Sequence, residues 1–204
     1  MKSAFDQLAN NQSVQNTIES LKNSGIDAIV VATGDEAKKK VLEMLPKGAE
    51  VMNMSSVTLE TIGLDKEINE SGNYDAVKPK LFKMDRKTQG VEMQKLGAAP
   101  VWTVGSVHAV TEDGKILIAS NSGSQLGPYA YASAHVIWIV GIQKIVKNLD
   151  EGINRINDYV LPLEDKHMHQ LYGVGSNVSK LLIINKEIKP GRITLIFVKE
   201  KLGF

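Results

Sequence analysis

Hydrophobic positions along the chain switch repeatedly between the spacing of a helix and the spacing of a strand. The first pattern is helical, because apolar residues at its start recur on one helical face: Ala4, Leu8, Val14, Ile18 and Leu21. The pair Asn10-Asn11 is the weak point of this predicted helix, and Ser24-Gly25 predicts its end.

The next three patterns read as strand, helix and strand. Residues 26–32 form a short β-rich run. Gly34 then opens a helical pattern that Pro46 stops, and residues 49–54 return to strand character. Residues 74–96 are mostly helical in pattern, with an interruption predicted at Pro79.

The second half of the chain is richer in strands. We predict one strand over Val101–Thr111, joined by the tight-turn pair Asp113-Gly114 to an antiparallel strand over Lys115–Ser120. The remaining expected elements are a buried strand over His135–Gly141, a helix over Leu149–Tyr159, and closing strands at about 180–185 and 192–198.

Alternating strands and helices of this kind predict a three-layer α/β/α fold with a mainly parallel sheet and a local β-hairpin. With 204 residues and 43% hydrophobic content, the chain is long enough for one substantial core. We therefore expect a single domain over residues 1–204, with an N-terminal helical segment over residues 1–24 packed on it.

Composition narrows the function. The 24 basic and 23 acidic residues leave a formal charge of +1, which does not favour binding to a nucleic-acid backbone. Absence of cysteine excludes disulfides, thiolate metal sites and cysteine-ligated iron–sulfur clusters within the chain, so we expect no cofactor of its own. No signal peptide or membrane-length apolar run is recognisable, so we expect a cytoplasmic protein without membrane insertion.

Functional residues of an α/β fold gather in loops at strand ends, and three such loops are polar here. The first follows the strand near Met54 and offers the hydroxyls of Ser55, Ser56 and Thr58 at a helix N-terminus. A simple helix cap is the alternative for the two serines. Glu60 is the nearby carboxylate and the weak candidate for a catalytic residue.

The second loop candidate lies in the predicted strand that ends at Thr111. Ser106 and His108 are two residues apart, so a strand would project both from one face, and Thr111 adds a further hydroxyl. No nucleophile elbow of the G-x-S-x-G type surrounds Ser106. Two interpretations of His108 stay open, a hydrogen-bonding role in a ligand pocket and a structural role.

The third loop candidate precedes a helical turn expected near Leu126. Its ligand-binding candidates are Ser122, Gly123, Ser124 and Gln125. Glycine permits close backbone approach to an anion, but the segment lacks a Walker A lysine and the dinucleotide fingerprint. An ordinary polar turn is the alternative.

Two further histidines were considered as metal ligands. His167-Met168-His169 would place both imidazoles on one side of a strand. The charged neighbours Asp165 and Lys166 favour an exposed loop instead, and no metal site is predicted.

Several motifs in order along the chain resemble the LUD (lactate utilization) domain family, also described as DUF162. They are TLETIG at 58–63, GSVHAVTEDGKI at 105–116, SGSQLGPYAY at 122–131, VGIQKIV at 140–146 and PGRITLIFVKEKLGF at 190–204. The resemblance implies a fold like that of NagB, RpiA and CoA transferases. It also matches Lys144 to a family G-x-x-K-I-V pattern, where the lysine either meets a carboxylate or is a surface residue.

The resemblance implies an accessory or ligand-binding component of L-lactate or other organic-acid utilization that binds a small anionic metabolite. Iron–sulfur clusters would then belong to partner oxidoreductase subunits, and a homo-oligomer stays open. The alternative is a stand-alone enzyme that resembles CoA transferases or 5-formyltetrahydrofolate cyclo-ligase. A transferase would need a carboxylate nucleophile, for which Glu60 is the candidate. Whether the chain is an enzyme is left open by the sequence.

Overall fold

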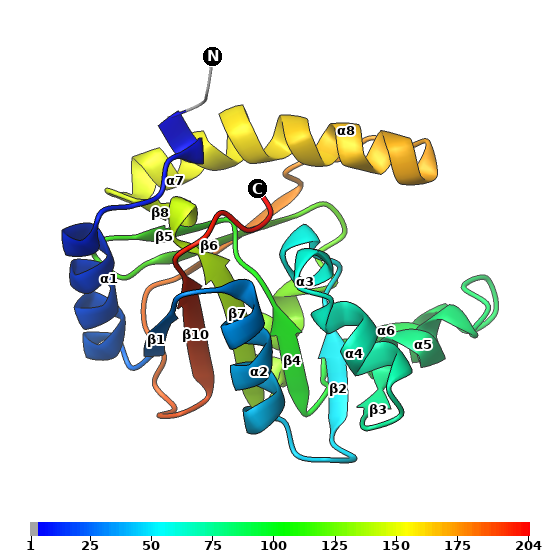
Figure 1. The fold of residues 1–204 in the computed structure, drawn as a ribbon. Helices are drawn as coiled ribbons and strands as arrows, with labels where there is room; N and C mark the ends of the chain where they lie inside the picture. Colours follow the sequence, from blue (N-terminus) through cyan, green and yellow to red (C-terminus); the bar gives the residue numbers. More distant parts are fainter. Residues whose placement is uncertain (1–3) are drawn as a thin grey trace.

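The computed structural model describes residues 4–204, and its central element is a parallel sheet of six strands (Figure 1). The sheet order is β1-β10-β7-β4-β2-β3. Its strands are β1 (Asp27–Val31), β2 (Glu50–Asn53), β3 (Asp75–Ala76), β4 (Trp102–Gly105), β7 (His135–Gly141) and β10 (Ile193–Val198). The protein therefore has the predicted three-layer α/β/α fold.

Both faces of this sheet are apolar because its central strands are continuous β-branched and aromatic runs. On one face, Ile137, Ile139 and Ile196 pack with residues of the helices α2 (Gly34–Met44), α3 (Val57–Thr61) and α4 (Leu64–Glu70). On the other, Trp138 and Phe197 pack with α1 (Asn11–Asn23) and with a second sheet. Strand alternation thus divides the core between two layers.

The second sheet contains the predicted hairpin and has the order β8-β5-β6-β9. Its strands are β5 (Ala109–Thr111), β6 (Ile116–Ser120), β8 (Ile145–Val146) and β9 (Lys180–Ile184). β5 and β6 pair antiparallel with Val110 opposite Ile116, and β9 pairs antiparallel with β6. Gly114, at φ 86°, occupies the left-handed position that the Asp113-Gly114 turn requires.

A long helical segment covers the outer face of the second sheet. It runs through α7 (Leu149–Arg155), a π-helical turn η4 (Ile156–Val160) and α8 (Leu161–Tyr172), as Figure 1 shows. Ile156 packs there against Ala109 and Leu117. The predicted helix over Leu149–Tyr159 was therefore too short, since the helical segment continues through η4 and past Pro162 near the start of α8.

Several sequence predictions need correction at the N-terminus and around Pro79. The first helix is interrupted, since a 3-10 turn η1 (Ala4–Asp6) precedes α1 and Asn10 is the N-cap of α1. Leu8 is consequently exposed rather than on a buried face. Residues 1–3 of the predicted segment over 1–24 lie outside the described residues. Pro79 lies inside the short helix α5 (Val77–Phe82), and the break before α6 (Gly90–Ala98) comes after Phe82.

The predicted strand over Val101–Thr111 is two strands in two different sheets. β4 ends at Gly105, the chain leaves the parallel sheet over residues 106–108, and β5 begins at Ala109. Ser106 and His108 therefore do not share one strand face. Instead, they lie in the connection between the sheets, at the carboxyl edge of the parallel one.

Gly105 is required where this connection begins, because Tyr129 packs against its backbone. Tyr129 lies in the π-helical turn η2 (Pro128–Ala132), is buried, and meets Trp138 edge to face with ring centroids 5.2 Å apart. A Cβ on Gly105 would lie 1.8 Å from the Tyr129 hydroxyl oxygen.

We expect Gly105→Ala to destabilise the protein by about 1–3 kcal/mol, as overpacking in a core does. Urea unfolding measures the effect. Gly90→Ala is the control, because a Cβ there meets nothing within 4 Å. Tyr129→Phe removes the clashing oxygen and should recover part of the loss in the double variant; equal stability of Gly105→Ala and Gly90→Ala would contradict the packing argument.

Candidate functional site

A cleft of about 830 Å³ opens at the carboxyl edge of the parallel sheet. Its inner part is formed by the segments that follow β2, β4 and β7, where an α/β fold places its ligands. Helix α8 forms the opposite wall with one of its faces. Residues of that wall recur at helical spacing: Leu161, Glu164, His167, Met168, Leu171 and Tyr172.

Most sequence-predicted site residues line this cleft. They are Ser55, Ser56, Thr58, Glu60, Ser106, His108, Ser122, Ser124, Gln125 and Lys144. Thr111 and Gly123 are not among the lining residues. The Thr111 hydroxyl accepts a hydrogen bond from the Lys115 backbone at 2.8 Å, and Gly123 donates to the Ser120 hydroxyl at 2.8 Å, so both serve local turns.

Lys144 lies at the inner end of the cleft and is only 3% exposed, so it is not a surface lysine. Its amino group donates to the hydroxyls of Thr58 at 3.2 Å and Ser106 at 3.1 Å, and to the Val107 carbonyl at 3.2 Å. The hydrogen-bond partners found within residues 4–204 are thus three neutral oxygens. Burial, with Arg155 as the second cause, holds the pKa of Lys144 well below its ordinary value.

The sequence positions this amine through a short 3-10 turn. η3 (Ile142–Lys144) follows β7 directly, and β8 begins at the next residue. Gln143 in the same turn donates to the Leu202 carbonyl at 2.9 Å, which fixes the turn against the C-terminal segment. Gly141 lets the C-terminal segment approach the end of β7, because a Cβ there would lie 2.7 Å from the Glu200 carbonyl oxygen.

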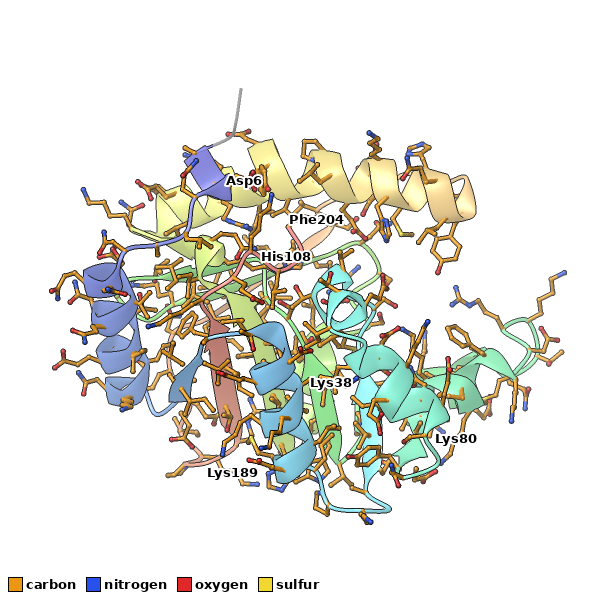
Figure 2. All side chains as sticks on the ribbon, viewed as in Figure 1. Asp6, Lys38, Lys80, His108, Lys189 and Phe204 are labelled. Atoms are coloured by element: carbon orange, nitrogen blue, oxygen red, sulfur yellow. The ribbon has the colours of Figure 1, made fainter. Side chains whose placement is uncertain are left out.

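His108 is held in one tautomer. The Ala119 backbone N–H donates to its Nδ1 at 3.1 Å, so Nδ1 is unprotonated and Nε2 carries the hydrogen. Burial, and then the positive charges of Lys144 and Arg155, lower the pKa of His108 to about 3. The imidazole is therefore a neutral hydrogen-bond donor at physiological pH. Figure 2 shows His108 and Phe204 toward the α8 side of the molecule, far from Lys189.

Arg155 stands behind this inner end. It is buried, its guanidinium donates to the His108 carbonyl, and it lies 5.3 Å from the centre of the Tyr159 ring. Burial lowers the pKa of Arg155 to about 10. Its positive charge faces both His108 and Lys144, so it disfavours a second positive charge on either.

The outer part of the cleft carries acidic side chains. Glu60 and Glu164 both line it, and burial together with Glu60 raises the pKa of Glu164.

The side chains of the two serines before α3 do not cap that helix. Lys78 donates a hydrogen bond to the Ser55 hydroxyl at 3.1 Å, so Ser55 bonds a lysine side chain. Ser56 occupies the N-cap of α3 without a side-chain capping bond, so the predicted serine cap is absent.

The loop over residues 120–127 closes one side of the cleft but satisfies most of its own polar groups. Gln125 accepts from the Ser120 hydroxyl at 3.1 Å and donates to the Ala119 carbonyl at 3.2 Å. The hydroxyls of Ser122 and Ser124 bond each other at 3.1 Å and are exposed. Its geometry is that of a polar turn whose outer hydroxyls face the cleft.

The sequence pattern does not predict the α8 wall, because the charged neighbours of His167-Met168-His169 favour an exposed loop there. Both histidines lie in α8, where residues two apart point in different directions. The His167 ring meets Phe204 at 6.1 Å, and His169 contacts the backbone of Asp165. No cluster of metal ligands occurs within residues 4–204. The apolar spacing of Leu161, Met168 and Leu171 was the signal that could have identified the helix.

The fold and the cleft together define an α/β protein with a cleft at the carboxyl edge of its sheet. A family model for the LUD domain matches residues 14–198, and the chain belongs to this family, which is related to lactate utilization. A DUF162 family protein from Deinococcus radiodurans has a similar structure, with a TM-score of 0.59, 12% identity, and coverage of 94% of this chain and 99% of that one.

A second solved structure, eIF2B beta from Chaetomium thermophilum, has a TM-score of 0.37 at 15% identity and covers 60% of this chain and 42% of its own. None of the curated proteins matches the sequence. Among the described residues, no helix combines the length and apolar character needed to cross a membrane.

The lowered pKa of His108 predicts how the stability of the folded protein changes at acid pH. The unfolded chain takes up a proton near pH 6.5, whereas the folded imidazole does so only near pH 3. Stability should therefore fall as pH drops through this range, by up to about 1.4 kcal/mol per unit. In His108→Asn, whose side-chain oxygen can accept from Ala119, urea unfolding should show a flatter acid limb.

His169→Asn is the matched control, because His169 lies exposed on α8. The difference between the acid limbs of His108→Asn and His169→Asn then isolates the effect of the buried imidazole. If the acid limbs of His108→Asn and the wild type coincide, His108 is not the neutral buried donor described above.

Proposed function

We propose that this protein binds a small organic anion at the inner end of the cleft and serves as an accessory or ligand-binding component of L-lactate or other organic-acid utilization. The observation that carries the proposal is the amino group of Lys144, which is buried at the end of a cleft and bonded to neutral oxygens. Membership of the LUD domain family supports the metabolic setting.

A carboxylate fits this end of the cleft chemically. In place of one of its three present bonds, the Lys144 amine can give it a charge-assisted hydrogen bond, and the Nε2–H of His108 can give it a neutral one. An arriving carboxylate favours the charged amine, so binding takes up a proton at a pH where Lys144 is neutral. Affinity for the anion should therefore weaken as pH rises, with Arg155 and His108 as the other groups that face the amine.

Partner proteins complete the proposal. The chain contains no cysteine that could ligate an iron–sulfur cluster. Oxidation of the organic acid would then take place in iron–sulfur oxidoreductase subunits, and this protein would hold or deliver the acid. A cytoplasmic location is also part of the proposal. Co-purification with such a subunit from the native cell would be the accompanying observation.

A thermal-shift measurement with lactate tests the binding step. A ligand at 100 times its Kd stabilises the native state by about 2.7 kcal/mol, which corresponds to a rise in Tm of about 5 °C or more. We expect this rise with lactate and pyruvate and none with lactamide, which has the same size but no carboxylate.

Lys144→Met should abolish the lactate shift, and the exposed Lys147→Met should retain it. Retention of the full shift in Lys144→Met would refute this site, and equal shifts with lactate and lactamide would show that the negative charge is not recognised.

A further inference from the structure

The hydroxyl of Ser106 and the amine of Lys144 lie 3.1 Å apart, and both line the cleft. This separation is within the range of a nucleophile and its general base. A second hydroxyl, that of Thr58, lies 3.2 Å from the same amine on another side. Three elements bring these groups together, since Thr58 lies in α3, Ser106 follows β4 and Lys144 follows β7.

The hydrogens and the lone pair of the neutral Lys144 amine determine how it can bond to the Ser106 hydroxyl. The Thr58 hydroxyl donates its own hydrogen to the Leu202 carbonyl at 3.3 Å, so it accepts from the amine. The Val107 carbonyl can only accept. A neutral amine has two hydrogens and one lone pair, and these two acceptors use both hydrogens. Ser106 is the remaining partner of the amine. Its hydroxyl donates a long bond of 3.5 Å to the Val107 carbonyl, and rotation of this hydroxyl directs the hydrogen to the lone pair of Lys144 3.1 Å away.

We infer that Ser106 and Lys144 form a serine–lysine pair that transfers the acyl group of an ester or thioester of a small organic acid, with Ser106 as nucleophile and Lys144 as general base. The inference rests on the proposed function, because the carboxylate that the cleft binds would be the product of this hydrolysis.

The reaction needs no further reactant except water. Ser106 Oγ attacks the acyl carbon while its proton passes to the Lys144 amine. The tetrahedral intermediate collapses, the carbon–oxygen or carbon–sulfur bond of the leaving group breaks, and the leaving group takes the proton from Lys144. Water then attacks the acyl-serine with Lys144 as base, which releases the carboxylate and restores the serine hydroxyl.

The surroundings of the pair favour the neutral amine that this chemistry requires. The partners of Lys144 are neutral oxygens, and the nearby charged group Arg155 is positive. His108 is neutral and presents its Nε2–H in the same cleft, where it can donate to the oxygen that becomes negative during attack. Thr58 is a positioning residue, because it orients the amine and does not meet the acyl group.

A fluorophosphonate probe tests the inference on the full-length protein. We expect one adduct by intact-mass spectrometry, mapped to Ser106 by peptide analysis, and none at that position in Ser106→Ala. Lys144→Met should slow the labelling about 100-fold or more, as loss of a general base does. The rate should rise with pH to a plateau with a midpoint below the ordinary lysine pKa. Arg155 and His108 are the other titratable groups facing Lys144.

Thr58 provides a second arm in case Lys144→Met does not fold. Thr58→Val should slow labelling and move the midpoint of the pH profile, and Thr58→Ser should restore both. Ser71→Ala, which removes an exposed hydroxyl outside the cleft, is the control and should label as the wild type does.

Absence of an adduct, an adduct on another serine, or equal labelling rates in Lys144→Met and the wild type would each overturn the serine–lysine pair. The lactate shift reports separately on anion binding. A protein that shifts with lactate but is not labelled retains the proposed function without acyl transfer.

Discussion

The amine of Lys144 can be buried only because oxygens from separate parts of the chain converge on it. Taking an amino group out of water is costly unless each of its hydrogens finds an acceptor. Here the acceptors come from the start of α3 and from the connection that follows β4. The ends of β2, β4 and β7 must therefore meet at one edge, and the order of the parallel sheet provides this.

The break between β4 and β5 has consequences on both sides of the site. By leaving the parallel sheet after Gly105, the chain turns the Val107 carbonyl toward Lys144 and carries His108 into contact with β6. In the same connection, the His108 carbonyl oxygen accepts a hydrogen bond from the Arg155 guanidinium. The point at which the chain leaves the parallel sheet thus gives Lys144 one of its acceptors and gives Arg155, the positive charge behind the amine, its acceptor.

The sequence predicted most strands of the two sheets, and most of its site candidates line the cleft, but it predicted neither the short strands β3 and β8 nor the contacts of Lys144. Long β-branched runs such as that of β7 identify buried strands by themselves, and the Asp113-Gly114 turn identifies the hairpin. The division of residues 101–111 between two sheets depends on tertiary pairing with β7 and β8, which no local pattern encodes. Lys144 was recognisable as a candidate, but its burial depends on segments far away in the sequence, such as Thr58.

The two ends of the cleft differ in charge, and this difference constrains what it can hold. The inner end presents the amine of Lys144 with the positive charge of Arg155 behind it, whereas Glu60, Glu164 and Lys78 line the outer part. A second negative charge on a small ligand would meet repulsion from the two glutamates except beside Lys78. A ligand with one carboxylate or acyl group inward and a neutral or cationic group outward meets favourable fields along its whole length. Charge distribution therefore selects the orientation of the ligand as well as its class.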